Sequence, residues 1–393
     1  MTSVHNKQKI KVLMITGVYY PELNGAVLQC MQLIRNISQS ITFSVLAGTN
    51  IRTKVVSECV EDVLVTRIPM PKNQNLKCIF GYLRFFLCLI NSLMKTDLVH
   101  IHGFSKRNAI VIAISRIFNK KVILKMTSLG QDDPLSIKKS FLSFWQVYKY
   151  CHAYIGLSPA FFRSYQAAGL PESKYNFIPN CVDHKKFMPI ITVQKNKLKN
   201  EYGFSDTDRI VLFVGHFSPE KRPMLAYDTW LLLHEKNHNV KMIFIGHTKG
   251  FFEVDDEIIE VMRQDATKRG VLSSIHFVEN TFHVDEYMKI ADVFLLPSTR
   301  EGLPNALLEA MASALPCFVT YLPEVTDWLV DDEKTGVLLH SDIPVGWADK
   351  IMPYLEEPDK QKQIGCEARR YVASNFSCTF VSSAMEDLYR KIL

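Results

Sequence analysis

Continuous apolar runs of strand length recur along the chain, and stretches with helical spacing separate them. The segment 26–40 is one such stretch, with apolar side chains at Leu28, Met31, Ile34 and Ile37. A strand that is apolar at successive positions is buried on both faces, which is typical of a parallel sheet covered by helices. The pattern therefore predicts an α/β fold. The runs of the first half are 9–16, 41–48, 97–103, 121–127, 153–158 and 175–180.

The pattern restarts after a polar, lysine-rich segment at 189–200, which we interpret as a linker or the approach to a helix. Two consecutive doubly wound α/β domains are therefore predicted, one over 1–185 and one over 186–376. Residues 377–393 also have helical spacing, and we expect them to form a final helix. The apolar runs of the second half are 209–215, 240–246, 274–280, 292–298 and 316–321.

The cysteines and the apolar stretches indicate the class of protein. Nine cysteines are scattered without a C-x-x-C pair, which indicates reduced thiols rather than a disulfide framework or a zinc site. The longest apolar stretch, 79–94, is interrupted by Arg84 and Asn91 and is too short to span a bilayer. The first apolar strand begins within the first ten residues, and we therefore expect no secretion signal. We therefore expect a cytoplasmic protein.

Charge is divided unevenly along the chain. Residues 1–185 contain 23 Lys and Arg against 9 Asp and Glu, a balance of +14, whereas the remainder has 23 against 31, a balance of −8. The first half is therefore expected to meet an anionic partner, such as a membrane surface or a lipid phosphate. A solvated basic surface without a partner is the alternative. Nucleic acid is not expected, because no Arg/Gly/aromatic module of the RNA-binding type is present.

Two segments in the second half follow an apolar strand and carry charged residues suited to phosphate. In 213–223, Gly215 permits close backbone approach, and Lys221 and Arg222 can neutralise a diphosphate. Ligands of open α/β sheets bind at the carboxyl ends of strands, where helix N-termini offer free N–H groups. A surface turn with two solvated cations is the alternative interpretation.

The second segment is 297–316, in which we place Pro304 in the first turn of a helix. Glu301 precedes this helix and Glu309 lies within it, eight residues later, so their axial separation is roughly 12 Å at 1.5 Å per residue. That distance is close to the span from a sugar across a diphosphate to a ribose. An amphipathic helix with two acidic residues is the alternative.

These two segments resemble the GT4 group of retaining glycosyltransferases, which have the GT-B fold. Glu301 to Glu309 resembles that family's E-x7-E motif, and VGHFSPEKR resembles its VGR-x-x-x-EK segment. YYPELNGA, VHIHGF, the stretch ending in IPNCVD, and DDEKTGVLL resemble further segments of the family in the same order. The resemblance implies two Rossmann-like domains facing a central cleft, with the C-terminal helix crossing back to an acceptor-side first domain.

The resemblance also implies roles for individual residues. Lys221 would pair with the donor phosphates, Glu309 with the ribose hydroxyls, and Glu301 with the donor sugar. No metal or other cofactor is expected, because cations and helix amides would stabilise the leaving diphosphate. The implied catalytic residues are Glu301, Lys221 and His102; the implied donor-binding residues are Gly25, Gly215, His216, Lys221, Arg222, Gly302, Leu303, Pro304, Asn305 and Glu309.

The chain departs from the family pattern at three places. His216 replaces an arginine and would bind phosphate in a pH-dependent way, and Cys181 replaces a glycine. Residues 127–128 read Thr-Ser where many relatives have a histidine, so His102 becomes the candidate for holding the transferred sugar or the acceptor. A packed strand-end histidine is the alternative for His102, and His100 shares its face of the strand.

Two basic and aromatic segments, 138–150 and 75–90, suit the headgroup region of a membrane. We expect membrane contact for 138–150 and burial for 75–90. The adjacent carboxylates Asp132 and Asp133 are interpreted as a solvated turn rather than a metal motif.

The sequence therefore predicts a glycosyltransferase that moves a sugar from a nucleotide sugar, most simply UDP-linked, to a glycan or lipid-linked acceptor. It would assemble a surface polysaccharide or glycoconjugate from the inner face of the cell membrane. The open alternatives are a nucleotide-sugar epimerase or a phosphorylase of the same fold, and a non-catalytic membrane-associated scaffold with a vestigial donor site. A nicotinamide enzyme is disfavoured, because no G-x-G-x-x-G follows the first strand.

Overall fold

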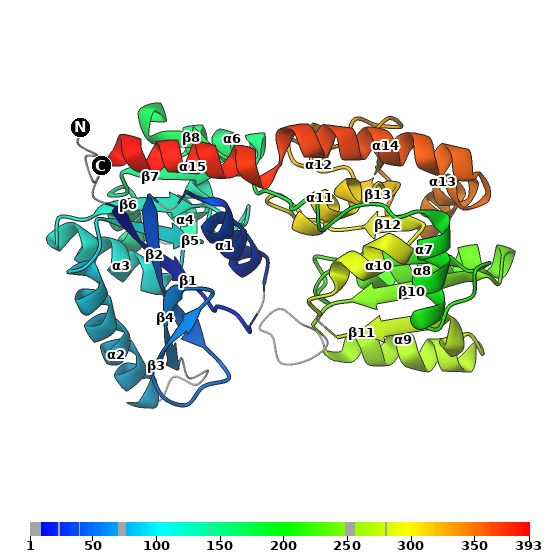
Figure 1. Cartoon of the computed structure of the whole chain (residues 1–393), viewed down its shortest axis with the longest axis horizontal. Coiled ribbons are helices and arrows are strands. Elements are labelled where there is room, and N and C mark those ends of the chain that lie inside the picture. The colour runs from blue at the N-terminus through cyan, green and yellow to red at the C-terminus, as the bar shows by residue number, and fades with distance from the viewer. Residues whose placement is uncertain are drawn as a thin grey trace, which may run out of the picture. The chain divides into compact units, whose positions relative to one another are not determined.

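The computed structural model describes residues 9–22, 24–38, 40–69, 76–140, 142–247, 256–279 and 281–393. The chain divides into two compact units, which we call unit 1 (residues 1–181 and 378–393) and unit 2 (residues 182–377) (Figure 1). The chain thus passes from unit 1 to unit 2 after Cys181 and returns at Cys378.

Unit 1 is built on one sheet with the strand order β3-β4-β2-β1-β5-β6-β7-β8 among the described residues. Every neighbouring pair is parallel except β3 and β4, which form an antiparallel hairpin at the edge. The central strands are buried on both faces, as their continuous apolar runs predict. The strands are β1 (Ile10–Thr16), β2 (Ile41–Thr49), β3 (Val56–Val60), β4 (Val63–Pro69), β5 (Leu98–His102), β6 (Lys121–Lys125), β7 (Ala153–Gly156) and β8 (Tyr175–Phe177).

Helices cover both faces of this sheet. The helices are α1 (Gly25–Asn36), α2 (Leu76–Leu93), α3 (Lys106–Ile117), α4 (Pro134–Ser140), α5 (Leu142–Tyr148), α6 (Pro159–Ala167) and α15 (Cys378–Ile392). The final helix, α15, packs beside α1 (Figure 1). Its Tyr389 is fully buried, and the hydroxyl lies 2.6 Å from Nδ1 of His100 on β5. The C-terminal helix is therefore an integral part of unit 1.

Unit 2 has an all-parallel sheet with the strand order β11-β10-β9-β12-β13-β14 among the described residues. In chain order this is 3-2-1-4-5-6, the Rossmann arrangement. Its strands are β9 (Arg209–Val214), β10 (Val240–Ile245), β11 (Ile275–Val278), β12 (Val293–Leu296), β13 (Cys317–Thr320) and β14 (Val337–Leu339). The prediction of doubly wound parallel sheets is confirmed.

The helices of unit 2 pack on both faces of its sheet. The lysine-rich segment interpreted as a linker or a helix approach forms α7, which is held by Lys195 and Lys199 on the buried carboxylate of Asp292 at 2.8 and 3.3 Å. The helices are α7 (Thr192–Glu201), α8 (Pro223–Lys236), α9 (Asp256–Lys268), α10 (Val284–Ile290), α11 (Asn305–Ala312), α12 (Thr326–Leu329), α13 (Pro344–Glu356) and α14 (Pro358–Asn375).

Candidate functional site

The strand order of unit 2 reverses between β9 and β12, which are neighbours in the sheet. One chain connection leaves the carboxyl end of β9 toward β10, and the other leaves β12 toward β13 on the opposite side. Such a switch point leaves a crevice outside the strand ends, where open α/β sheets bind ligands. Both predicted phosphate segments begin there, because 215–222 follows β9 and 297–304 follows β12.

An ion pair joins the two segments at this switch point. Lys221 Nζ donates to Glu301 Oε1 at 2.6 Å. The Glu301 side chain is only 7% exposed, whereas that of Lys221 is 25% exposed. The pair therefore consists of a fixed, buried carboxylate and an ammonium group that still faces solvent. A charge-assisted hydrogen bond of this kind positions both groups, and the ammonium group can also meet an anion from the solvent side.

Arg222 has a different environment from the one that the sequence suggested. It adopts a left-handed backbone conformation (φ 48°) immediately before α8. Its guanidinium donates to the Pro297 carbonyl, to Thr320 Oγ1 at 2.9 Å and to the Asp342 carboxylate. These partners follow β12, end β13 and precede α13, so Arg222 holds the carboxyl ends of neighbouring strands together. Its guanidinium is thus engaged with three protein oxygens of unit 2.

Gly215 and His216 lie where β9 and β10 end side by side. A Cβ atom on Gly246, after β10, would lie 1.9 Å from the carbonyl oxygen of Gly215, so the close approach of these backbones requires glycine at 246. The ring of His216 stacks on that of His247 with 5.5 Å between centroids. Burial, with help from His247 and Lys221, lowers the pKa of His216 to about 4. His216 is therefore neutral around pH 7, and the pH-dependent phosphate binding expected of it lies in the acid range.

The loop before α11 is buried from Glu301 to Pro304. Pro304 precedes the helix, which begins at Asn305, one residue later than the sequence placed it. Gly302 and Leu303 lie between the Glu301 carboxylate and the N-terminus of α11, which begins at Asn305. The positive end of the α11 dipole thus adjoins the loop that carries Glu301, the carboxylate partner of Lys221.

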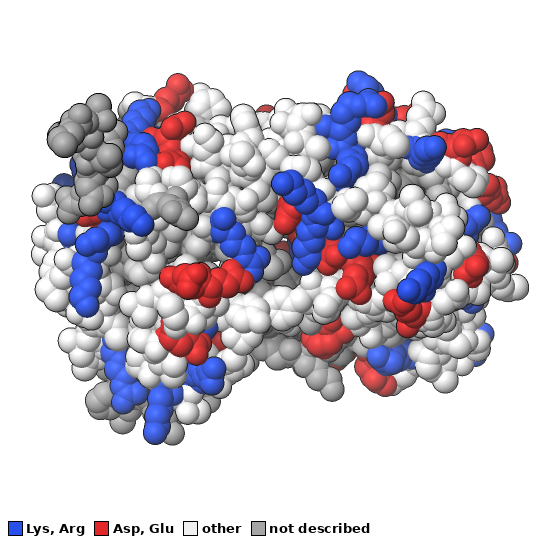
Figure 2. All heavy atoms as spheres, viewed as in Figure 1, with Lys and Arg blue, Asp and Glu red and all other residues white. Residues whose placement is uncertain are grey.

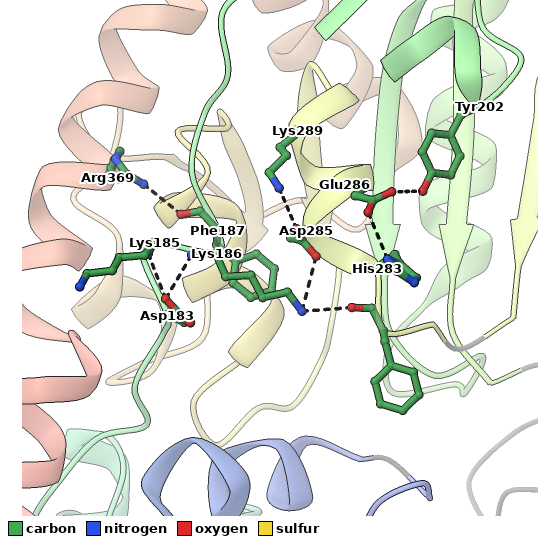
Figure 3. Close-up of polar contacts among 11 residues, drawn as sticks. Asp183, Lys185, Lys186, Phe187, Tyr202, His283, Asp285, Glu286, Lys289 and Arg369 are labelled. Carbon is green, nitrogen blue, oxygen red and sulfur yellow. Dashed lines mark hydrogen bonds and ion pairs between the residues drawn. The ribbon is translucent and has the colours of Figure 1, made fainter. Parts of the chain in front are cut away.

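Glu309 lies farther along α11, in a polar surrounding that the sequence did not reveal. Burial is the main cause that raises the pKa of Glu309, the ammonium group of Lys186 lowers it, and Asp285 raises it; together they leave the pKa at about 8. Lys186 extends toward α10, where Nζ donates to the Phe282 carbonyl at 3.1 Å and lies 3.5 Å from Asp285 Oδ1 (Figure 3). Lys186 is the third residue after the NCVD segment. The sequence did not single it out, because its position does not distinguish it from the adjacent Lys185.

The predicted residues of unit 1 lie at the carboxyl edge of its own sheet. Gly25 is the first residue of α1, where the Asn24 side chain accepts a hydrogen bond from Val27 N at 2.9 Å. His102 ends β5, and its ring stacks on His100 with 4.5 Å between centroids, as their shared strand face predicts. Burial, with His100 and Lys125, holds the pKa of His102 well below its usual range. Neither ring nitrogen of this neutral histidine has a hydrogen-bond partner among the described residues.

The prediction of a solvated turn at Asp132 and Asp133 is wrong, because both side chains are buried. Asp132 accepts hydrogen bonds from the backbone amides of Thr127, Ser128 and Phe104 and from the Thr127 hydroxyl at 2.7 Å. It thereby joins the loops that follow β5 and β6. Asp133 accepts from Gly130 N at 2.6 Å and from the Ser164 hydroxyl. Within the described ranges, no group of three or more His, Cys, Asp or Glu residues is arranged to hold a metal ion.

Comparison with known proteins supports the resemblance. Residues 194–371 match the family described as "Glycosyl transferases group 1", so the resemblance is confirmed over that segment. N-acetyl-alpha-D-glucosaminyl L-malate synthase of Bacillus anthracis is 25% identical over 56% of this chain and 54% of its own length. UDP-Gal:alpha-D-GlcNAc-diphosphoundecaprenol alpha-1,3-galactosyltransferase of Escherichia coli is 29% identical over 42% of this chain and 41% of its own length. The matched part of the chain thus spans about half the length of these curated relatives.

A solved structure resembles the chain over almost all of its length. Anabaena Alr3699/HepE, described in complex with UDP and glucose, has a TM-score of 0.77 and 16% sequence identity, and the match covers 97% of this chain and all of that one. At this identity the likeness concerns the fold. The prediction of a GT-B fold with two Rossmann-like domains is confirmed.

Proposed function

With residues 194–371 matching the group 1 glycosyl transferases, we propose that the chain is a retaining hexosyltransferase that uses a nucleotide sugar. The observation that carries the proposal is the Lys221–Glu301 ion pair at the switch point of unit 2. It brings a cation, a carboxylate and a helix N-terminus to the strand ends where nucleotides bind in such sheets. The Glu309 carboxyl group on the same helix extends the site toward a ribose.

In the proposed reaction, the acceptor oxygen bonds to the anomeric carbon on the face from which the nucleoside diphosphate leaves. The diphosphate takes the electron pair of the broken carbon–oxygen bond, and the acceptor proton passes to a phosphate oxygen. Lys221 and the first amides of α11 stabilise the charge that develops on the leaving group. Glu301 accepts hydrogen bonds from hydroxyls of the donor sugar. Because these groups supply the positive charge, we propose that no metal ion is needed.

The donor is proposed to be a UDP-sugar. The name of the Escherichia coli relative includes UDP-Gal, and HepE is described with UDP. Glu309 would accept hydrogen bonds from the ribose hydroxyls, and Gly215 would allow the backbone to approach the diphosphate. In unit 1, His102 and Gly25 lie at the carboxyl edge of the sheet, and we assign them to the acceptor and the diphosphate respectively. Both ring nitrogens of the neutral His102 are buried without a hydrogen-bond partner among the described residues, and in this form one nitrogen can accept a hydrogen bond and the other can donate one.

Unit 1 is proposed to bind an anionic membrane surface that presents a lipid-linked acceptor. Between residues 76 and 131 the chain has nine Lys and Arg and only one acidic residue, Asp97. The α2 helix, which we expected to be buried, is amphipathic: Phe85 and Leu89 are buried, whereas Leu83 and Leu87 are 54% and 61% exposed. Exposed apolar side chains amid basic residues are typical of interfacial helices. For residues 75–80, the first part of the segment 75–90 that we expected to be buried, the structure does not describe the side chains.

Within the segment 138–150, for which we expected membrane contact, Tyr150 is 43% exposed, and the side chains of 141–143 lie outside those that the structure describes. Its Trp145 and Tyr148 side chains are buried, and Lys138 Nζ donates to the Ala168 carbonyl at 3.0 Å. We therefore assign the membrane surface to α2. Lys and Arg side chains are visible at the left-hand end of Figure 2, where Figure 1 shows α2, β3 and β4. No helix in the described ranges has both the length and the apolar content to cross a bilayer, and we propose peripheral binding at the inner face of the cell membrane.

Ligand-induced stabilisation tests the donor site. The thermal midpoints of wild type, Lys221→Ala and Glu309→Ala are measured with UDP-, GDP- and ADP-sugars, without metal and with a chelator. A ligand at 100 times its dissociation constant adds about 2.7 kcal/mol to the stability of wild type. We expect UDP-sugars to stabilise wild type in the presence of chelator and both variants to lose this effect. Lys236→Ala, which removes an exposed lysine paired with Asp349, is the matched control.

The outcome also separates the alternatives. No stabilisation by any nucleotide sugar in wild type, with a folded protein, would support a scaffold with a vestigial site. Epimerised nucleotide sugar without a glycoside product, in a mixture of donor and lipid acceptors, would support an epimerase. A requirement for orthophosphate would support a phosphorylase.

Binding to vesicles tests the membrane surface separately. Wild type is expected to co-sediment with vesicles that contain anionic phospholipid, and Leu83→Ser/Leu87→Ser is expected to bind several-fold less. Ile343→Ser is the control, because Ile343 is a similarly exposed apolar residue of unit 2. Equal binding by wild type and the α2 variant would remove α2 from the proposed surface.

A further inference from the structure

Two cysteine thiols lie at the two points where the chain passes between the units. Cys181 is the last residue of unit 1 before the first crossing, and Cys378 is the first residue after the second. Cys378 also begins α15. In the structure Cys378 Sγ lies 3.0 Å from Cys181 Sγ, and neither cysteine is in a disulfide. A covalent S–S bond is about 2.05 Å long, so the two sulfur atoms need to approach by only about 1 Å.

The backbone around Cys181 is held firmly by α1. The Gln29 side chain donates from Nε2 to the Cys181 carbonyl at 2.9 Å and accepts from Cys181 N at 3.0 Å. Cys181 is not among the residues with positive φ. A side chain is therefore accommodated here without backbone strain, and it points at the start of α15.

On the unit 2 side, the two chain segments that pass between the units are hydrogen-bonded to each other. Val182 N donates to the Phe376 carbonyl at 2.9 Å, and Val182 and Ser377 form a parallel bridge. Each thiol is thus directly next to a residue of this bridge in the sequence. The Gln32 Oε1 atom lies 3.6 Å from Cys378 Sγ on its other side. Hydrogen bonds to the flanking backbone therefore keep the two thiols facing each other.

A buried ammonium group lies near the Cys181 thiol. Lys125 is the last residue of β6, and the Cys181 and Cys30 thiols each act to raise the pKa of its ammonium group. Burial lowers the pKa of Lys125 to about 8, so the ammonium form still predominates near pH 7. A cation beside a thiol favours the thiolate, which is the form that attacks a disulfide or a peroxide. Cys181 is therefore the thiol of the pair that a cation affects; Cys181 and Cys378 are both buried, with 4% and 7% of the residue exposed.

We propose that Cys181 and Cys378 are an oxidative modification site, at which a low-molecular-weight disulfide oxidises the two thiols to a reversible Cys181–Cys378 disulfide. With a disulfide oxidant, the Cys181 thiolate attacks one sulfur and releases the first thiol of the oxidant. Cys378 then attacks the mixed disulfide, forms the Cys181–Cys378 bond and releases the second thiol. The protein loses two protons and two electrons, and the oxidant is reduced to two thiols.

The new bond would join the two crossings and close residues 181–378 into one covalent ring. It would also link α15 covalently to the segment of unit 1 that ends at Cys181; noncovalent contacts such as the His100–Tyr389 pair now hold the helix there. A disulfide that closes a long loop restricts the unfolded chain, so the oxidised protein is expected to be more stable than the dithiol.

The test is oxidation of the intact chain with glutathione disulfide, followed by peptide mapping without reduction. We expect a peptide pair linked through Cys181 and Cys378, a protein mass lower by two hydrogen atoms at this pair, and a higher thermal midpoint. Dithiothreitol is expected to reverse all three changes. The exposed thiols of Cys59 and Cys366 should form mixed disulfides with glutathione and confirm that the oxidant acted.

Two variants control the assignment. Cys378→Ser should remove the linked peptide and the rise in thermal midpoint, whereas Cys317→Ser, which removes a buried cysteine of unit 2, should retain both. The proposal is overturned when Cys59 and Cys366 carry glutathione while Cys181 and Cys378 of wild type stay unlinked. Because that result comes from wild type, it does not depend on the folding of any variant.

Discussion

Lys221 and Glu301 depend on each other in a way that unfolding can measure. The Glu301 side chain is almost fully buried, and its carboxylate is 2.6 Å from Lys221 Nζ. Removing the lysine leaves a buried charge without its partner, which costs more than the pair itself contributes. Lys221→Ala is therefore expected to lower the free energy of unfolding by about 2 kcal/mol in urea titrations. The double variant Lys221→Ala/Glu301→Gln should recover part of the loss, and a fully additive double variant would contradict this coupling.

Glu309 predicts a pH dependence of stability with a definite sign. Its pKa is raised from 4.5 to about 8 in the folded protein, so the folded state keeps this proton while the unfolded state loses it. Stability of wild type should therefore fall as pH rises from 4.5 to 8, whereas Glu309→Gln lacks this contribution. We expect the variant to match wild type at pH 5 and to exceed it by about 1–3 kcal/mol at pH 8.5 in urea titrations.

Glu367→Gln, a change in the middle of α14 at a side chain that is 37% exposed, is the control for this experiment and should show no such divergence. A difference between Glu309→Gln and wild type that is the same at both pH values would place the titrating group elsewhere. Saturating UDP-sugar should change the pH profile of wild type only, because the proposed ribose contact needs the carboxylate.

The environments of single residues were the hardest to predict from the sequence. Lys221 and Glu301 were singled out from their positions after strands, and the structure brings them together. Arg222 had the same local context, but a neighbouring carbonyl, hydroxyl and carboxylate engage its guanidinium. Asp132 and Asp133 accept hydrogen bonds from their own loop, at Thr127, Ser128 and Gly130. Phe104 and Ser164, which lie in other segments, complete these contacts. Contacts between segments that are distant in the sequence cannot be predicted from the residues that flank each contact.

At the scale of elements, Asp132 gives a prediction about the loops that follow β5 and β6. Its carboxylate accepts from three backbone amides and a hydroxyl, although burial raises its pKa to about 6. Asp132→Ala would leave these buried donors unsatisfied and is expected to cost about 3 kcal/mol of stability, measured by urea unfolding. Asp132→Asn keeps one acceptor oxygen and should cost less. Equal costs for both variants would show that the hydrogen bonds contribute little.

Elements with continuous apolar runs were predictable, and elements at the sheet edge were not. β1, β5, β6, β9 and β12 coincide with predicted runs, because burial on both faces removes polar residues from the strand. The hairpin of β3 and β4 was missed. Its strands alternate buried and exposed positions, as at the exposed Leu64, and its turn places Glu61 and Asp62 at positive φ without a glycine. The usual turn signal was therefore absent.

At the scale of the whole molecule, strand order explains why two sequence segments 80 residues apart form one site. The Lys221 and Glu301 loops follow the first and fourth strands of unit 2, which are neighbours only because the order reverses between them. The sequence supports an α/β fold, but the order of strands depends on how the chain returns across the sheet. The family resemblance, rather than the apolar pattern, therefore predicted that both loops serve one ligand.

The division of charge between the two halves predicts a salt dependence of membrane binding. Residues 1–185 carry a balance of +14 and the remainder −8, and screening shortens the reach of such charges to about 10 Å at 0.1 M salt and about 3 Å at 1 M. Binding to anionic vesicles is expected to weaken at least tenfold between these salt concentrations in sedimentation assays. UDP-sugar binding should change far less, because its contacts are local and partly buried. Binding to vesicles that is equally strong at both salt concentrations would assign the membrane contact to the apolar side chains of α2 alone.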